Sequence, residues 1–257
     1  VRRLQYPASK WLKYKVLVEN EEIAPYLPET MTLDQDTFFE MFDKYDLLYV
    51  KPSIGGGGKG VFRVERTEKW YIFQTRKKKM RFRKLHSVWV YLQKLIPPQK
   101  RYLVQQGLNL MHIDERPVDF RVILVKPRRN SEWEYKGIIG KCAAKDSHIT
   151  NRCSGGTSIR FHEALQQGLE YDEVQCEEAA EMLKTLSLNI AETMNEYFVN
   201  INQLGLDIGI DQDEQFWLIE ANTRPNFQLF RHHEEPKMFA HIRAEIRKLR
   251  EPNKKKA

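Results

Sequence analysis

Apolar and polar residues alternate along residues 204–225, and this pattern predicts a β-hairpin near the end of the chain. Residues 211–215 are rich in Asp, Gln and Glu and form the expected turn. In this register Asp207 lies opposite Glu220, and Asn222 follows two residues later on the same face. The opposite face is expected to be apolar and to carry Leu206, Ile208, Ile210, Trp217 and Ile219.

Hydrophobic periodicity predicts the elements along the rest of the chain. Helices are expected at 33–45, 85–95, 177–198 and 234–249, with Asp34 or Asp36 capping the first and Ser87 the second. Strands are expected at 47–52, 61–64, 70–75, 101–106, 118–126 and 133–141. The strands are expected to pair mainly antiparallel, which gives an α+β fold. We divide the chain into an N-terminal segment at 1–25, a small lobe at 26–105, a larger lobe at 106–240, and a helix end with a basic tail at 241–257.

Two carboxylates that face each other across a strand pair repel, so the pairing of Asp207 with Glu220 needs an explanation. One explanation is a hard divalent cation, since Mg²⁺ takes oxygen ligands and commonly binds one or two carboxylates together with substrate phosphates. Asn222 adds a carboxamide beside them. The alternative is a solvated hairpin face on which the two acids tolerate each other.

A glycine-rich segment, YVKPSIGGGGKG at 49–60, joins two of the expected strands. Glycine lets the backbone approach a phosphate closely and direct several N–H groups at it, and Lys51 and Lys59 add positive charge. The segment is not a P-loop, because Lys59 is followed by Gly60 and a strand instead of Ser or Thr and a helix. We interpret it as a phosphate-binding flap on a hairpin; the alternative is a flexible turn.

The composition is that of a globular protein. Its 257 residues suit one large or two small domains, and a hydrophobic content of 41% suffices for a core. No apolar run is long enough to span a membrane. The three cysteines, Cys142, Cys153 and Cys176, show neither metal-ligand spacing nor a disulfide framework, which is typical of a reducing cytoplasm.

The chain carries a net charge of +7, from 42 Lys and Arg against 35 Asp and Glu. Much of the excess lies in residues 76–84, RKKKMRFRK, and in the lysines at 254–256. The first segment suits an acidic peptide, a polyphosphate or a nucleic acid. Lysines also protect sheet edges from aggregation, so a solvated edge strand is the alternative that we favour, and nucleic acid is not an expected partner.

The order of these motifs resembles that of an ATP-grasp domain. It comprises a strand with Lys-Pro, a glycine flap, a strand ending in Gln-Gln, a strand with Asp-Phe-Arg, a Gly-Gly loop, a long helix, and a hairpin with Asp and Glu-Ala-Asn. The chain is similar to the YheC/YheD branch, bacterial proteins associated with the endospore coat. The resemblance is carried by SKWLKY (9–14), YLPET (26–30), YVKPSIGGGGKG (49–60), YLVQQGLNL (102–110), RPVDFRVILVK (116–126), GLDIGID (205–211) and IEANTRPNF (219–227).

The resemblance implies that ATP and Mg²⁺ bind between two lobes of mainly antiparallel sheet. The implied phosphate ligands are Lys10, Lys51 and the flap residues Gly55, Gly56, Gly57, Gly58, Lys59 and Gly60. The implied adenine neighbours are Gln105 and Gln106, and the implied Mg²⁺ ligands are Asp207, Glu220 and Asn222. The residues implied at the transferred phosphate are Arg121, Arg224, Asn151 with the Gly-Gly loop at 155–156, and Lys141, where many relatives are expected to have arginine.

The implied activity is that of a ligase, in which ATP converts a carboxylate to an acyl phosphate that an amine then attacks, with ADP as a product. The expected substrates are an amino acid, a peptide or another small carboxylate, together with an amine acceptor. The alternatives are a kinase that phosphorylates a hydroxyl group and a non-catalytic ATP-binding protein of the spore coat. Because the sequence starts just before Lys10, we expect no N-terminal domain of the kind common in ATP-grasp ligases. The expected location is the cytoplasm or the spore coat.

Overall fold

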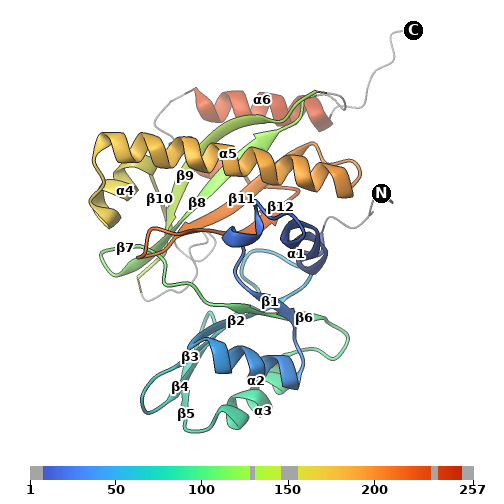
Figure 1. The fold of residues 1–257 in the computed structure, drawn as a ribbon, viewed down its shortest axis with the longest axis vertical. Helices are drawn as coiled ribbons and strands as arrows, with labels where there is room; N and C mark the ends of the chain where they lie inside the picture. Colours follow the sequence, from blue (N-terminus) through green and yellow to red (C-terminus); the bar gives the residue numbers. More distant parts are fainter. Residues whose placement is uncertain (1–7, 128–130, 146–155, 233–236, 251–257) are drawn as a thin grey trace.

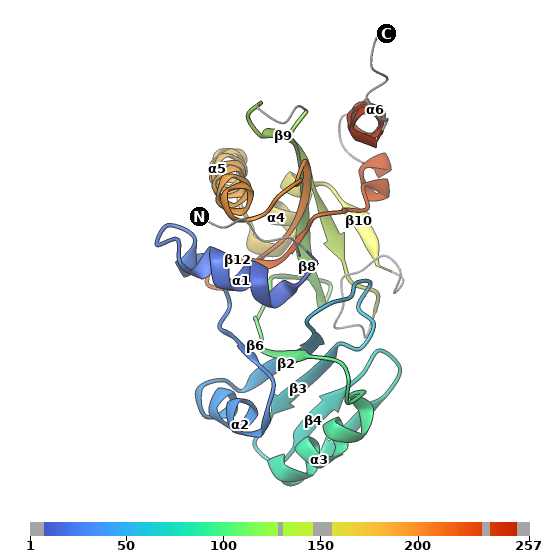
Figure 2. The same ribbon diagram turned by 90° about the vertical axis from the view of Figure 1, so that its right-hand side faces the viewer.

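The structure is a computed structural model that describes residues 8–127, 131–145, 156–232 and 237–250. These residues form two lobes, each built on an antiparallel sheet of six strands (Figure 1). The lobes are stacked along the long axis of the molecule (Figures 1 and 2). Helices pack on both sheets, so the fold is α+β, as the sequence predicts.

The small lobe has the strand order β1-β6-β2-β3-β4-β5. Its strands are β1 (Thr30–Thr32), β2 (Leu47–Pro52), β3 (Phe62–Arg66), β4 (Tyr71–Gln74), β5 (Lys79–Phe82) and β6 (Tyr102–Gln106). Helices α2 (Gln35–Lys44) and α3 (Leu85–Leu95) pack on one face, where Phe38, Phe42 and Phe73 are fully buried. Because side chains alternate along a strand, Tyr49 and Lys51 lie on the other face and line a cleft toward the large lobe.

The large lobe has the strand order β10-β9-β8-β11-β12, with β7 paired to β8. Its strands are β7 (His112–Ile113), β8 (Arg116–Val125), β9 (Glu134–Cys142), β10 (Thr157–Ile159), β11 (Gln203–Ile210) and β12 (Phe216–Asn222). Helix α5 (Glu173–Tyr197) lies over one face and α6 (Met238–Arg250) over the other (Figure 2). Helix α4 (Phe161–Leu169) packs beside α5, and two short 3₁₀ helices span Ala24–Tyr26 and Gln228–His232. Both faces of the sheet are covered, and every residue of β11 is buried.

Both ends of the described chain pack on the large lobe. Helix α1 (Lys10–Val18) contributes Val16 and Leu17 to the core beneath α5. Helix α6 contributes Ile242 and Ile246 to a second core on the opposite face of the sheet. The N-terminal helix is therefore built into the large lobe, although the small lobe follows it in the sequence.

Capping hydrogen bonds mark the starts of α2 and α5. In α2 the backbone N–H of Thr37 donates to the Asp34 carboxylate and the N–H of Asp34 donates to the Thr37 hydroxyl, so Asp34 is the N-cap. Helix α5 begins four residues before the predicted start because Asp172 forms a second capping box. The prediction that Ser87 caps α3 is wrong, since that helix already begins at Leu85.

The predicted hairpin is present as β11 and β12, and Asp207 pairs with Glu220 as expected. A β-bulge follows this pair, so Ile208 lies opposite Leu218 and Ile219 is the extra residue. The core face consequently pairs Leu206, Ile208 and Ile210 with Ala221, Leu218 and Phe216. The placement of Trp217 and Ile219 on the apolar face is therefore wrong. Trp217 lies opposite Gly209, on the same face as Asp207, and Ile219 lines the cleft.

Two further expectations concern a membrane span and the cysteines. None of the helices among the described residues has the length and apolar character needed to cross a membrane. Cys142 and Cys176 are buried free thiols, and Cys153 lies outside the described residues.

Candidate functional site

A cleft of about 790 Å³ lies between the two lobes. Its walls come from the glycine-rich segment, from β2 and β6 of the small lobe, and from the four strands β8, β9, β11 and β12 of the large lobe. Seven basic side chains line it against three acidic ones: Lys10, Lys51, Lys59, Arg121, Lys141, Arg224 and Arg231 against Asp119, Asp207 and Glu220. This excess of positive charge favours an anionic small molecule.

Asp207 is buried between two cations on the large-lobe side of the cleft. The strand register places Arg121 directly opposite Asp207, and its Nε and Nη2 donate to Oδ1 and Oδ2 at 2.8 and 2.9 Å. Lys141 Nζ lies 2.5 Å from Oδ1 of Asp207 and 2.8 Å from Oδ1 of Asp119. Burial alone raises the pKa of Asp207, but the charges of Arg121 and Lys141 outweigh burial and hold the pKa well below its usual value.

Glu220 and Asn222 lie at the same end of the cleft as Asp207. Asn222 Nδ2 donates to Oδ2 of Asp207 at 3.1 Å, and Oε1 of Glu220 lies 3.2 Å from Lys10 Nζ. The Glu220 side chain is 25% exposed, so a ligand in the cleft can reach it. Two carboxylates and one carboxamide form the oxygen-rich donor set that a hard cation such as Mg²⁺ prefers, so the residues fit this metal.

Lys10 connects this end of the cleft to the glycine-rich segment. Its Nζ donates to the Gly55 carbonyl at 2.5 Å while it contacts Glu220, and its backbone N–H donates to the Ser53 carbonyl at 2.8 Å. Ser9, the N-cap of α1, also lies within hydrogen-bond distance of the Ser53 hydroxyl, at 3.3 Å. The start of α1 therefore fixes the base of the glycine-rich segment relative to β12.

Lys51 lies in the small-lobe wall of the cleft at the end of a buried hydrogen-bonded chain. Its Nζ donates to Oε1 of Gln105 at 2.6 Å, Gln105 Nε2 donates to the Thr30 hydroxyl at 2.7 Å, and Thr30 donates to the Pro28 carbonyl. Burial lowers the pKa of Lys51 to about 8, although the charge of Glu220 opposes the shift. The side chain of Gln105, predicted beside the adenine, thus orients Lys51.

The glycine-rich segment forms one wall of the cleft. Gly55, Gly56, Gly57, Gly58 and Lys59 line the cleft, whereas Gly60 does not. Gly57 has a φ of +69°, a conformation that other residues rarely adopt, and a Cβ there would meet no atom within 4 Å. At Gly60 a Cβ would lie 2.7 Å from the Tyr102 hydroxyl. Gly60 therefore allows the segment to pack closely against Tyr102 of β6, on the side away from the cleft.

The remaining predicted residues fall into two groups. Gln106 and Arg224 line the cleft, and Arg224 is exposed there. Gln106 accepts a hydrogen bond from the backbone N–H of Glu29 at 3.1 Å. Asn151 and the glycine at 155 lie outside the described residues.

Lys13 is a site residue that the sequence analysis missed. It is 6% exposed, and its Nζ donates to the carbonyl of Ala221, the residue between Glu220 and Asn222. Burial lowers the pKa of Lys13 to about 8. The available signal was the spacing of Lys10 and Lys13, because residues three apart share one face of a helix.

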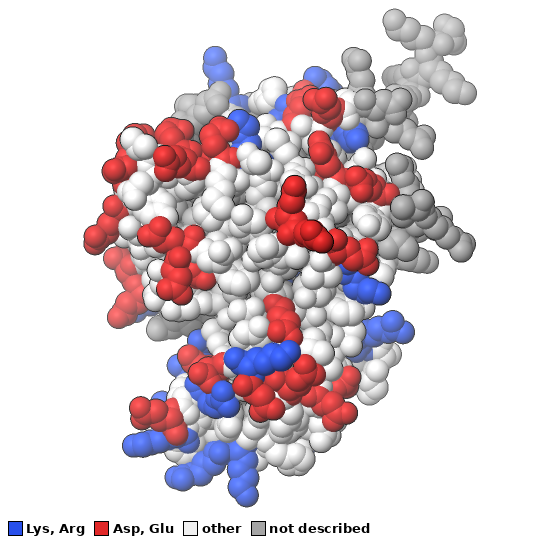
Figure 3. Space-filling model, viewed as in Figure 1, with Lys and Arg blue, Asp and Glu red and all other residues white. Residues whose placement is uncertain are grey.

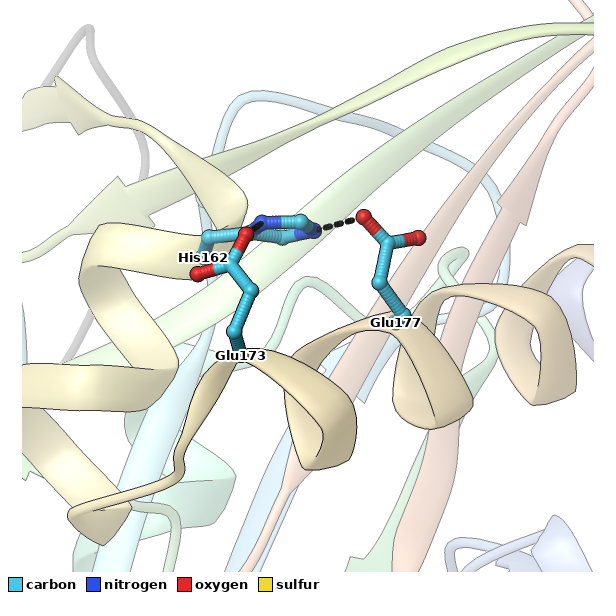
Figure 4. Close-up of side chains that lie close together, drawn as sticks. All are labelled: His162, Glu173 and Glu177. Atoms are coloured by element: carbon cyan, nitrogen blue, oxygen red, sulfur yellow. Dashed lines mark ion pairs between the residues drawn. The ribbon is translucent and has the colours of Figure 1, made fainter.

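A second group of metal-type side chains lies away from the cleft, where α4 meets α5 (Figure 4). His162 Nδ1 lies 3.5 Å from Glu173, and its Nε2 lies 3.8 Å from Glu177. The two carboxylates approach different ring nitrogens, and both are more than half exposed. We therefore interpret this group as two ion pairs that join the helices and not as a metal site.

The comparison with protein families decides the identity of the fold. A model of YheC/D like ATP-grasp proteins matches residues 5–248. The chain belongs to this family. The resemblance found in the sequence is thereby confirmed, and the matched residues include both lobes that enclose the cleft.

Two curated relatives come from Bacillus subtilis (strain 168). The endospore coat-associated protein YheD is 28% identical over 231 residues, which are 87% of this chain and 49% of YheD. The endospore coat-associated protein YheC is 23% identical over 222 residues, which are 84% of this chain and 60% of YheC. The chain thus spans about half the length of YheD.

Solved structures show the same fold at low sequence identity. The ATP-grasp ligase PsnB complexed with its minimal precursor has a TM-score of 0.53 and 11% identity, over 94% of this chain and 60% of PsnB. PsnB complexed with precursor peptide PsnA2 and AMPPNP has a TM-score of 0.51 and 12% identity, over 95% and 59% of the two chains. The ATP-grasp fold predicted from the sequence is confirmed.

Proposed function

We propose that the chain is a ligase that binds Mg–ATP in the cleft between its lobes and activates a carboxylate for attack by an amine. One observation carries the proposal: Asp207, Glu220 and Asn222 meet at one end of a cleft that cations and a glycine-rich segment line. Oxygen ligands, positive charge and close backbone approach are what a metal-bound triphosphate requires.

Each part of the cleft has a role in this proposal. Lys10 and Lys51 neutralise phosphate charge, and the segment 55–59 covers the phosphates. Asp207, Glu220 and Asn222 would hold Mg²⁺, which when bound supplies positive charge to the outer phosphates. Adenine would lie toward Gln105 and Gln106 on β6, as the family resemblance implies.

The proposed reaction requires positioning and charge more than covalent help from the protein. A substrate carboxylate oxygen bonds to the terminal phosphorus of ATP, and ADP leaves. An amine nitrogen then bonds to the acyl carbon, phosphate leaves, and the nitrogen loses a proton as the amide forms. Arg121, Lys141 and Arg224 offer fixed positive charge beside the reacting groups.

A peptide or amino acid is the first substrate class to test. Arg224 and Arg231 are exposed and line the cleft, and guanidinium groups bind carboxylates through two parallel hydrogen bonds. The similar ligase PsnB binds a precursor peptide. We therefore propose a carboxylate that is part of a peptide or amino acid as the substrate and a second amine as the acceptor.

The proposed reaction is tested by incubating the protein with ATP, Mg²⁺ and a library of amino acids and peptides, followed by mass spectrometry and a phosphate assay. A ligase gives ADP, free phosphate and a product formed with loss of water. A phosphoester without free phosphate would identify a kinase instead. AMP and pyrophosphate would contradict the proposal, and nucleotide binding without any product would indicate a binding protein.

The location of the protein is a separate part of the proposal. Both curated relatives are named as endospore coat-associated proteins, and we extend that association to this chain. Fractionation of spore layers from the source organism tests it, because the chain should be recovered with the coat. Recovery only with the cytoplasmic fraction would favour the cytoplasm, which the cysteine pattern predicts.

A further inference from the structure

The basic segment 76–84 forms the free edge of the small-lobe sheet. Strand β5 pairs with β4 and has no other partner among the described strands. It lies at the lower end of the small lobe, where blue side chains project from the surface (Figures 1 and 3). The surface is separate from the cleft, because no residue of β5 lines it.

The hairpin register shows which backbone groups of β5 point outward. The N–H of Thr75 donates to the Lys78 carbonyl at 2.8 Å, so these two form a hydrogen-bonded pair. Hydrogen-bonded and non-hydrogen-bonded pairs alternate along antiparallel strands. The pairs Gln74–Lys79 and Ile72–Arg81 are then of the second kind. The N–H and C=O groups of Lys79 and Arg81 therefore face the open edge.

Five of the basic side chains on this edge have no ion-pair partner among the described residues. Lys77, Lys78, Lys79, Arg81 and Lys84 are exposed, and none of their side chains makes a hydrogen bond or ion pair with a described residue. There is no acidic residue between positions 76 and 84. The edge thus combines free backbone groups with uncompensated charge.

The strand is nevertheless well formed. The ring of Phe82 packs against Phe73 and Tyr91, with centroids 6.5 and 5.6 Å apart, so alternate residues of β5 are fixed to the core. Arg83 lies over the ring of Trp70 at 4.7 Å. An ordered edge of this kind offers a template for another strand.

We propose that β5 binds an extended acidic peptide as an additional strand. The peptide backbone would pair with Lys79 and Arg81, and acidic side chains at alternate positions would face their side chains. A second copy of β5 would instead place basic residues against basic ones, so the charge that prevents self-association selects an acidic partner. A nucleic acid needs only the charge and makes no use of the free backbone groups.

The proposal is tested with the full chain and a labelled peptide of about eight residues in which Glu alternates with Val. The control peptide has the same composition, but its glutamates are consecutive. Arg81→Ala removes the charge. Arg81→Pro removes both the charge and the outward N–H, and a proline at such a position is tolerated in an edge strand. We expect Arg81→Ala to weaken binding about fivefold and Arg81→Pro to weaken it about fivefold further.

Hydrogen exchange on the unmodified chain gives a readout that does not depend on how the variants fold. Exchange at the amides of Lys79 and Arg81 should slow when the alternating peptide binds. Unchanged exchange would overturn the proposal. Equal binding of both peptides, equal effects of the two variants, or equally tight binding of single-stranded DNA would also overturn it, because each indicates a general polyanion surface.

Discussion

Arg121 and Asp207 lie opposite each other on neighbouring strands, and the guanidinium donates to both oxygens of the carboxylate. Lys141 contacts the same carboxylate, so a proposed Mg²⁺ ligand is also the centre of a buried ion-pair network. Breaking a buried network of this kind costs more than breaking a surface pair, because it leaves a charge without a partner. The stability of the chain is therefore coupled to the state of its cleft.

Replacement of Lys141 should reveal this coupling. Lys141→Met leaves Asp119 and Asp207 with less compensating charge, and we expect the free energy of unfolding to fall by about 3 kcal/mol. Mg²⁺ should restore part of the loss by binding the carboxylate charge that Lys141 no longer compensates. Urea unfolding with and without Mg²⁺ measures both effects, with the exposed Lys145→Met as the control. Equal stability of Lys141→Met and the original chain would contradict the structural role.

Lys13 should affect ligand binding more than folding. Burial lowers the pKa of Lys13 to about 8, so Met removes the cost of burying a charge, and this gain should offset the hydrogen bond to the Ala221 carbonyl that Met cannot make; the unfolding free energy should therefore change little. The replacement should weaken Mg–ATP binding about tenfold, since the carbonyl between Glu220 and Asn222 loses a donor. Calorimetric titration of Lys13→Met beside the exposed Lys15→Met checks this. Equal nucleotide affinities in the two variants would count against a positioning role.

Two neighbouring glycines provide a matched test of whether the backbone geometry of the glycine-rich segment matters for nucleotide binding. A Cβ at Gly56 or Gly57 meets nothing within 4 Å, but only Gly57 has a positive φ. Gly57→Ala should therefore strain the segment by about 1–2 kcal/mol and weaken nucleotide binding by roughly tenfold, whereas Gly56→Ala should not. Nucleotide titrations measure this difference. A similar affinity in both variants would indicate that the geometry of the segment is irrelevant to binding.

The lowered pKa of Lys51 predicts a pH dependence. The lysine loses its charge as pH rises through about 8, so affinity for a nucleotide should fall over that range. In the unliganded chain the same group costs stability at low pH, and this cost disappears as pH rises from about 8 to 10.5. Lys51→Arg keeps its charge and should bind with a flatter pH profile. Identical profiles for both proteins would rule out Lys51 as the titrating group.

Local patterns were sufficient to predict the hairpin and the glycine-rich segment. The pairing of Asp207 with Glu220 follows from a short turn and from alternation, both of which operate within a few residues. The Asp34 cap is equally local. Such features depend on interactions between residues that are close together in the sequence, so the sequence alone is enough to predict them.

Features that depend on segments far apart in the sequence could not be predicted from local patterns. The contact between Arg121 and Asp207 requires β8 and β11 to be neighbouring strands, although the two residues are 86 positions apart in the sequence. The bulge at Ile219 shifts the register of the hairpin, and turn length and alternation alone do not predict such a shift. By contrast, the solvated edge strand favoured for residues 76–84 is present as β5, and its bounds follow the local alternation Lys-Met-Arg-Phe.

The most direct test of the account is the dependence of ATP binding on Mg²⁺ in Glu220→Gln. Isothermal titration with ATP, with and without Mg²⁺, compares this variant with the original chain and with Glu192→Gln, whose side chain is exposed on α5. If Glu220 binds Mg²⁺, the original chain and Glu192→Gln should bind ATP in a Mg²⁺-dependent way, and Glu220→Gln should lose at least about tenfold in affinity. Equal Mg²⁺-dependent affinity in all three proteins would contradict it.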